Sequence, residues 1–121
     1  MMVRGVRGAT TTEANEEKQI LEATKEVLAK MISENQITPE QVAQVIITVT
    51  PDLNATFPAK ALRLFEGWTY VPVMCATEIN VPHALKKCIR IMMTINTEKK
   101  QQEIKHIYLK EATQLRPEFS R

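Results

Sequence analysis

The sequence of 121 residues predicts one α/β (α+β) domain, with a mixed sheet of about five strands, one long helix and short helices. Two observations favour this class. One long segment carries apolar residues at helical spacing, and several short segments rich in β-branched residues are separated by turn residues. A third observation concerns assembly. The predicted helices are too few to cover both faces of the sheet, so one face should be an apolar patch that pairs with another copy of the chain.

The first expected element is a strand over residues 2–12, which ends in three consecutive threonines. Gly5 and Gly8 interrupt it, and a glycine inside a strand marks either tight packing or the close approach of another group. A long amphipathic helix follows. Asn15 is expected as its N-cap, and apolar residues from Ile20 to Ile32 line one side over about five turns.

The remaining elements are shorter. The sequence predicts strands at 42–50, 70–75, 85–95 and 106–109, and a turn of helix after Thr38. It also predicts a helix at 58–65 stopped by Gly67, a loop or frayed turn at 97–105 and a tail at 112–121. Pro72 confines its strand to an edge or end position. In the strand at 85–95, Ile89 and its alternate neighbours share one face, whereas Arg90 and Met92 share the other.

Composition excludes several classes of function. Sixteen Lys and Arg against 14 Asp and Glu leave a formal charge of +2, which does not supply the strong basic field of a nucleic-acid-binding protein. A hydrophobic fraction of 44% excludes global disorder. No apolar run approaches the roughly 18 residues of a membrane span. The start of the chain lacks a secretory signal, so we expect a cytoplasmic location and free thiols at Cys75 and Cys88.

Motifs for metal or cofactor chemistry are missing from the sequence. No Cys or His pair has zinc-ligand spacing, and there is no phosphate-binding loop, dinucleotide fingerprint or serine nucleophile elbow. We therefore expect neither a metal nor a cofactor. Cys75 is open to two interpretations, a nucleophile or a small hydrophobic packing residue.

Charged residues inside apolar strands are the most informative feature. Arg90 interrupts the most hydrophobic strand, Arg7 lies between Gly5 and Gly8, and Glu78 follows an apolar run. Arg90 and Glu78 could form a buried ion pair that only fixes strand register. Alternatively, the two arginines and the carboxylate converge on a small anionic ligand, which arginine binds with a two-pronged geometry.

A resemblance emerges when several motifs are taken together. They are RGVRGATT at 4–11, TPDLNATFPAKALR at 50–63, GWTYVPVMC at 67–75, LKKCIRIMMT at 85–94, HIYL at 106–109 and LRP at 115–117. In this order they resemble the monofunctional trimeric chorismate mutases of the α/β class over nearly the whole chain. Met74, where the family usually has threonine, and the stretch 80–83 depart from its pattern.

The resemblance implies a single chorismate mutase domain over residues 1–121 that converts chorismate to prephenate, on the route to phenylalanine and tyrosine. Three chains would form a pseudo-α/β-barrel with active sites between subunits and no metal, cofactor, nucleic-acid or membrane partner. The implied catalytic residues are Arg7, Glu78 and Arg90. One subunit would bind substrate through Arg7, Met74, Cys75, Ala76, Thr77, Glu78, Arg90 and Tyr108. The neighbouring subunit would contribute Phe57, Ala59, Lys60, Arg63, Leu115 and Arg116, the last two from a tail at 112–121 that closes over the site.

The implied mechanism is conformer selection with electrostatic stabilisation. Arg90 would contact the ether oxygen, where negative charge grows, and Glu78 would accept a hydrogen bond from the ring hydroxyl. Three alternatives share the architecture: a trimeric imine or enamine hydrolase, a catalytically silent trimer that binds small acids, and an RNA-binding trimer. Of these, the RNA-binding trimer would require exposed aromatic residues among basic ones, and the six aromatic residues do not supply them.

Overall fold

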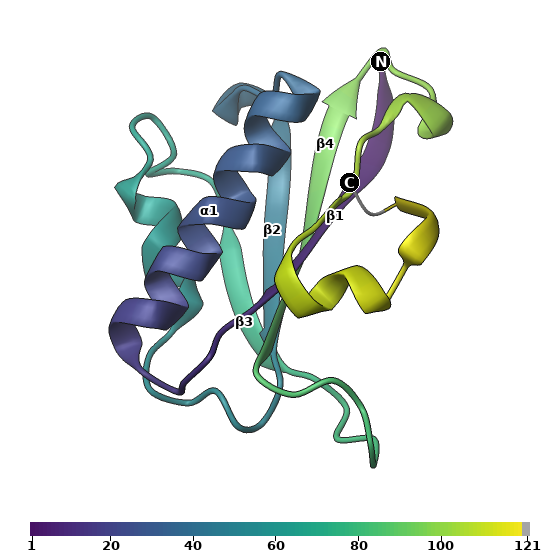
Figure 1. Ribbon diagram of the computed structural model, residues 1–121. Helices are drawn as coiled ribbons and strands as arrows, with labels where there is room; N and C mark the ends of the chain where they lie inside the picture. The colour runs from purple at the N-terminus through teal and green to yellow at the C-terminus, as the bar shows by residue number, and fades with distance from the viewer. Residues whose placement is uncertain (120–121) are drawn as a thin grey trace.

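The computed structural model describes residues 1–119, built on a mixed sheet with the strand order β3-β2-β4-β1-β5 (Figure 1). The strands are β1 (Met2–Thr11), β2 (Val42–Val49), β3 (Val73–Thr77), β4 (Cys88–Thr97) and β5 (Ile107–Tyr108). β4 pairs antiparallel with β1 and β2, whereas β3 and β5 join as parallel edge strands. The predicted mixed sheet of five strands is confirmed, and the strand after Pro72 is an edge strand as expected.

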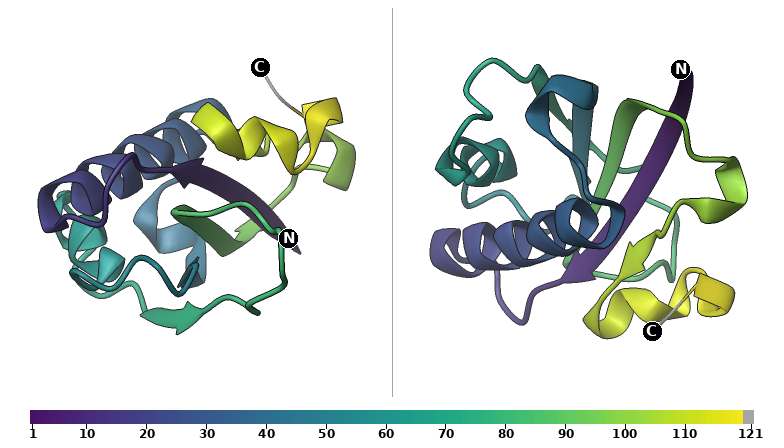
Figure 2. Two further views of the ribbon diagram at one scale, coloured as in Figure 1. Left: turned by 60° about the horizontal axis from the view of Figure 1, so that its bottom comes forward. Right: turned by 90° about the horizontal axis from the view of Figure 1, so that it is seen from above.

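Helix α1 (Glu17–Asn35) lies across one face of this sheet, as the two further views in Figure 2 show. Its apolar stripe packs on β1 and on the 3-10 helix η2 (Pro58–Leu64), which also contacts β3. The side chains fully buried between the layers include Val6, Ile20, Val27, Leu28, Met31, Val45, Ile47, Ile89, Met93 and Ile95. The predicted helix face and the alternation along β4 are therefore confirmed.

Gly8 of β1 faces helix α1. A Cβ atom at this position would overlap Sδ of Met31 and lie 3.2 Å from Cγ2 of Val27. Tight packing is therefore the interpretation that holds for Gly8. At Gly5 a Cβ atom would meet only Sδ of Met92, at 3.2 Å, on the opposite face.

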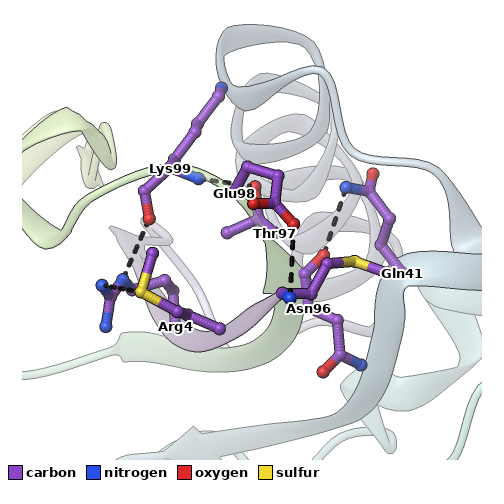
Figure 3. A network of polar contacts seen from close by, with 8 residues as sticks. Arg4, Gln41, Asn96, Thr97, Glu98 and Lys99 are labelled. Carbon is purple, nitrogen blue, oxygen red and sulfur yellow. Dashed lines mark hydrogen bonds and ion pairs between the residues drawn. The ribbon is translucent and has the colours of Figure 1, made fainter.

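Polar contacts fasten the start of β1 to the end of β4 (Figure 3). Nε of Arg4 donates to the carbonyl of Lys99 at 3.0 Å, and Nε2 of Gln41 donates to the carbonyl of Asn96 at 3.3 Å. Gln41 ends the short 3-10 helix η1 (Pro39–Gln41), which Thr38 caps as predicted. The Arg4 contact thus joins β1 to the segment after β4, and the Gln41 contact joins η1 to β4.

Two predicted helix ends are wrong in detail. α1 begins after Glu16, not after Asn15, because the Asn15 carboxamide oxygen accepts hydrogen bonds from the backbone of Asn54 and Ala55. The predicted helix at 58–65 is a 3-10 helix that ends at Leu64, before Gly67, whose φ is +88°.

The other differences concern the strand at 70–75 and the C-terminal half of the chain. β3 begins at Val73 because Pro72 cannot donate to the ladder. The segment at 97–105, predicted as a loop or frayed turn, contains the short 3-10 helix η3 (Gln101–Glu103). The predicted tail at 112–121 is largely formed by the 3-10 helices η4 (Lys110–Gln114) and η5 (Pro117–Phe119). Residues 120–121 of that tail lie outside the described residues.

The face of the sheet opposite α1 carries an exposed apolar row. Ile46 of β2 pairs with Met74 of β3 and with Met92 of β4, and the exposed fractions of these residues are 39%, 73% and 43%. The apolar patch expected from the small number of helices is thus present on this chain. Among residues 1–119, no helix is long and apolar enough to cross a membrane.

Candidate active site

A cavity of about 220 Å³ opens on the uncovered face of the sheet, beside the apolar row. Its polar and charged lining consists of Arg7, Thr48, Glu78, Arg90 and Tyr108, and its apolar lining includes Ile46 and Met92. The cavity therefore gathers the two arginines and the carboxylate that interrupt apolar sequence.

Strand register explains why these residues meet. Thr48, Arg90, Ala9 and Tyr108 occupy successive positions across β2, β4, β1 and β5. Successive side chains on a strand point to opposite faces. Arg7 is two residues before Ala9 in β1, so both lie on the same face. Ala9 lies between Arg90 and Tyr108 in this row and also lines the cavity.

Glu78 lies just past the end of β3, and two strands hold it. Its backbone N–H donates to the carbonyl of Val49 at 2.8 Å. One carboxylate oxygen, Oε2, accepts a hydrogen bond from the hydroxyl of Thr48, and the other, Oε1, lies 3.6 Å from Nη1 of Arg90. The Arg90 side chain is 47% exposed, so the pair is not buried in this chain and its guanidinium remains accessible to a ligand.

Arg7 and Tyr108 form the other side of the cavity. The backbone N–H of Arg7 donates to Nδ1 of His106 at 2.9 Å, which ties β1 to the segment before β5. Burial lowers the pKa of His106, and the nearby charges of Arg7 and Arg116 lower it further. Tyr108 is buried against Ala9 and Ala112. The phenol is thus fixed by packing before any ligand arrives.

A second groove, of about 440 Å³, lies at the β3 edge of the same chain. Its lining includes Phe57 and Lys60 from the start of η2, and Cys75 and Thr77 from β3. Phe57 is strongly exposed, and Nζ of Lys60 lies 3.0 Å from Oε2 of Glu17. This groove therefore combines an apolar surface with a cation.

Residues 3–119 match the model of the chorismate mutase type I family. The chain belongs to the chorismate mutase type I family. It is 52% identical to chorismate mutase AroH of Bacillus subtilis over 99% of this chain and 94% of that protein. It is 45% identical to chorismate mutase AroH of Thermus thermophilus over 98% of this chain and 97% of that protein. A solved chorismate mutase from Clostridium thermocellum superposes with a TM-score of 0.87 at 44% identity, covering 90% of this chain and 96% of that one.

In this member of the chorismate mutase family, Arg7, Glu78, Arg90 and Tyr108 line the same cavity, and their roles toward a substrate stay predictions. Met74 lies on the same face, paired with the cavity residue Ile46. Cys75 does not enter the cavity. It pairs with Ile47 on the face covered by α1 and lines the β3-edge groove, because side chains alternate along β3. Ala76 and Thr77 line that groove as well.

The tail residues are placed differently from the prediction. Leu115 packs against Tyr108 and Ala112 of its own chain, and the Arg116 charge acts on His106. Both residues therefore lie near the cavity residues of their own chain, since η4 follows β5 directly. The prediction had assigned them to the neighbouring subunit. Ala59 and Arg63 lie on η2, the first half-buried and the second exposed, beside the groove residues Phe57 and Lys60.

Thr48 also lines the cavity and was not among the residues predicted from the sequence. The available signal was strand alternation: Thr48 faces away from buried Ile47 and therefore shares the open face with Arg90. In residues 1–119 no three His, Cys, Asp or Glu side chains gather as a metal site would require. Cys75 and Cys88 are free thiols, as predicted, and burial raises the pKa of Cys88 to about 11.

Proposed function

We propose that this chain catalyses the rearrangement of chorismate to prephenate, in a site that two neighbouring subunits of a homotrimer complete together. The family is one of chorismate mutases. The single observation that carries the proposal is the open cavity in which Arg7, Arg90 and Glu78 converge on an uncovered sheet face. Two guanidinium groups suit the two carboxylates of the substrate, and one carboxylate suits its ring hydroxyl.

The reaction demands positioning and charge stabilisation, not a nucleophile. Chorismate is a flexible dianion, and the bond that forms must be aligned with the bond that breaks. Arg7, helped by Tyr108, would hold one carboxylate. Arg90 would contact the other carboxylate and the ether oxygen, where negative charge grows as the C–O bond breaks. Glu78 would accept from the ring hydroxyl and face the ring, where positive charge develops.

The second half of the site would come from the groove at the β3 edge. The cavity opens on the uncovered face of the sheet and the groove lies at its β3 edge, so one copy's cavity could meet another copy's groove. Such a head-to-tail contact closes into a ring when the rotation permits, and a threefold ring would cover the apolar row. Phe57 would then help exclude water, and Lys60 with Arg63 would attract the dianion. Cys75 would enter the site from this half.

The direct test is to mix the pure protein with chorismate and follow the loss of its ultraviolet absorbance, with light scattering on the same sample. We expect turnover by a homotrimer. A monomer that persists at micromolar concentration and still turns over chorismate would contradict the shared site. A trimer that binds chorismate without converting it would support the silent small-acid-binding alternative.

A further inference from the structure

Thr48 lines the cavity, but the proposed mechanism gives it no role. It pairs with Arg90 of β4 on one side and with Ala76 of β3 on the other. Glu78 lies two residues beyond Ala76, and its side chain turns back over β2 so that Oε2 accepts the Thr48 hydroxyl proton. The hydroxyl therefore lies between the strands that deliver the arginine and the carboxylate.

The two contacts of the Glu78 carboxylate differ in strength. The 3.6 Å separation between Oε1 and Nη1 of Arg90 is longer than a hydrogen bond, and the guanidinium is half exposed. The bond from Thr48 is a hydrogen bond to a charged acceptor between half-buried side chains. Thr48, more than Arg90, fixes the orientation of the carboxylate.

Substrate binding would sharpen this difference. If Arg90 turns to a substrate carboxylate and the ether oxygen, its contact with Glu78 weakens, whereas the Thr48 bond is unaffected. A threonine hydroxyl has one proton to donate, and here it goes to Oε2. Oε1 is left with its lone pairs for the ring hydroxyl and for the positive charge that develops on the ring.

We propose that Thr48 is a positioning residue, which holds the Glu78 carboxylate in its reactive orientation while Arg90 is engaged by substrate. This inference rests on the proposed function. Because the charge that Glu78 faces grows only as the reaction proceeds, a loosened carboxylate should lower kcat more than it raises KM.

The test compares three variants. Thr48→Val keeps the shape and removes the hydroxyl, Thr48→Ser keeps the hydroxyl, and Thr94→Val makes the same change on the open face outside the cavity. We expect Thr48→Val to lower kcat about tenfold, the scale of one hydrogen bond to a charged group, with a smaller change in KM. Thr48→Ser should restore most of kcat, and Thr94→Val should leave it unchanged.

A double-mutant cycle shows whether Thr48 acts through Glu78. In a Glu78→Ala background, assayed at high enzyme concentration, Thr48→Val should have no further effect on kcat. If Thr48→Val lowers kcat as much in the Glu78→Ala background as in the wild type, the positioning role is overturned. It is also overturned if Thr48→Ser lowers kcat as much as Thr48→Val does. If the wild-type protein turns over chorismate and Thr48→Val does so equally well, this inference alone fails. A wild-type protein without turnover overturns the proposed function and this inference with it.

Discussion

Replacing Arg90 by citrulline separates its charge from its shape. Citrulline keeps the length and planarity of the side chain but carries no positive charge. Cys88 lies two residues before Arg90, so native ligation of a synthetic peptide that begins at Cys88 introduces the change without any other alteration of the sequence.

The expected free-energy cost of losing the Arg90 charge differs between folding and catalysis. The ion pair of Arg90 with Glu78 spans 3.6 Å and the arginine is 47% exposed, so after solvent screening its loss should destabilise the fold by at most about 1 kcal/mol. In catalysis the same charge would face the ether oxygen inside a closed site. There we expect kcat to fall by a factor on the order of 10²–10⁴, or roughly 3–5.5 kcal/mol of activation free energy.

Steady-state kinetics with chorismate measures the effect, and circular dichroism with light scattering verifies the folded assembly. KM should rise much less than kcat falls, because in the proposed site Arg7 would still hold a carboxylate. Arg90→Lys should rescue little, since a point charge on a flexible stem cannot span two acceptors together. A citrulline protein with near-parental kcat would show that conformer selection alone drives the reaction.

Three further predictions follow from packing, thiol chemistry and titration. Gly8→Ala should lower the free energy of unfolding by about 1–3 kcal/mol, because the new Cβ atom overlaps Sδ of Met31; chemical denaturation measures the loss. Cys75→Ser should keep most activity, and mass spectrometry during turnover should show unmodified protein, because a pericyclic reaction forms no covalent intermediate. The pKa of His106 is lowered from 6.5 in the folded chain, so the unfolded chain binds its proton more readily. The free energy of unfolding should therefore fall as pH drops below about 6.5, and His106→Gln should flatten this dependence.

For each of these predictions one outcome, measured at a fixed protein concentration, would contradict it. Gly5→Ala places a Cβ atom against the flexible, exposed end of Met92 and should destabilise less than Gly8→Ala; equal effects would contradict the packing argument. A substrate adduct on Cys75 would overturn the mechanism. A pH dependence of the free energy of unfolding that is as steep in His106→Gln as in the wild type would refute the role of His106.

The fold was predictable where the determining pattern is local. The apolar periodicity of α1 and the alternation of Ile89 and Arg90 along β4 are properties of consecutive residues, and both are confirmed. The N-cap was not predictable in the same way. Asn15 has capping chemistry, but Asn54, far along the chain, supplies a competing set of hydrogen bonds.

The candidate site was likewise predictable only where the determining pattern is local. Arg7, Arg90 and Glu78 stood out because charge is rare inside apolar strands, and the cavity contains all three. The placement of Cys75 depends on which face of β3 it occupies, and that requires the register with β2. Thr48 was missed because its partner, Glu78, lies 30 residues away and no local pattern connects them.

Complementation between inactive variants tests the shared site most directly. Arg7→Ala damages the cavity, and the double variant Lys60→Ala, Arg63→Ala damages the groove. When the two proteins are unfolded and refolded together in equal amounts, about one quarter of the sites should join an intact cavity to an intact groove. We therefore predict recovery of about a quarter of wild-type activity. The control mixes Arg7→Ala with Arg90→Ala, which damage the same cavity, and should recover none. Activity no higher than either parent in the first mixture would contradict a site built by two subunits.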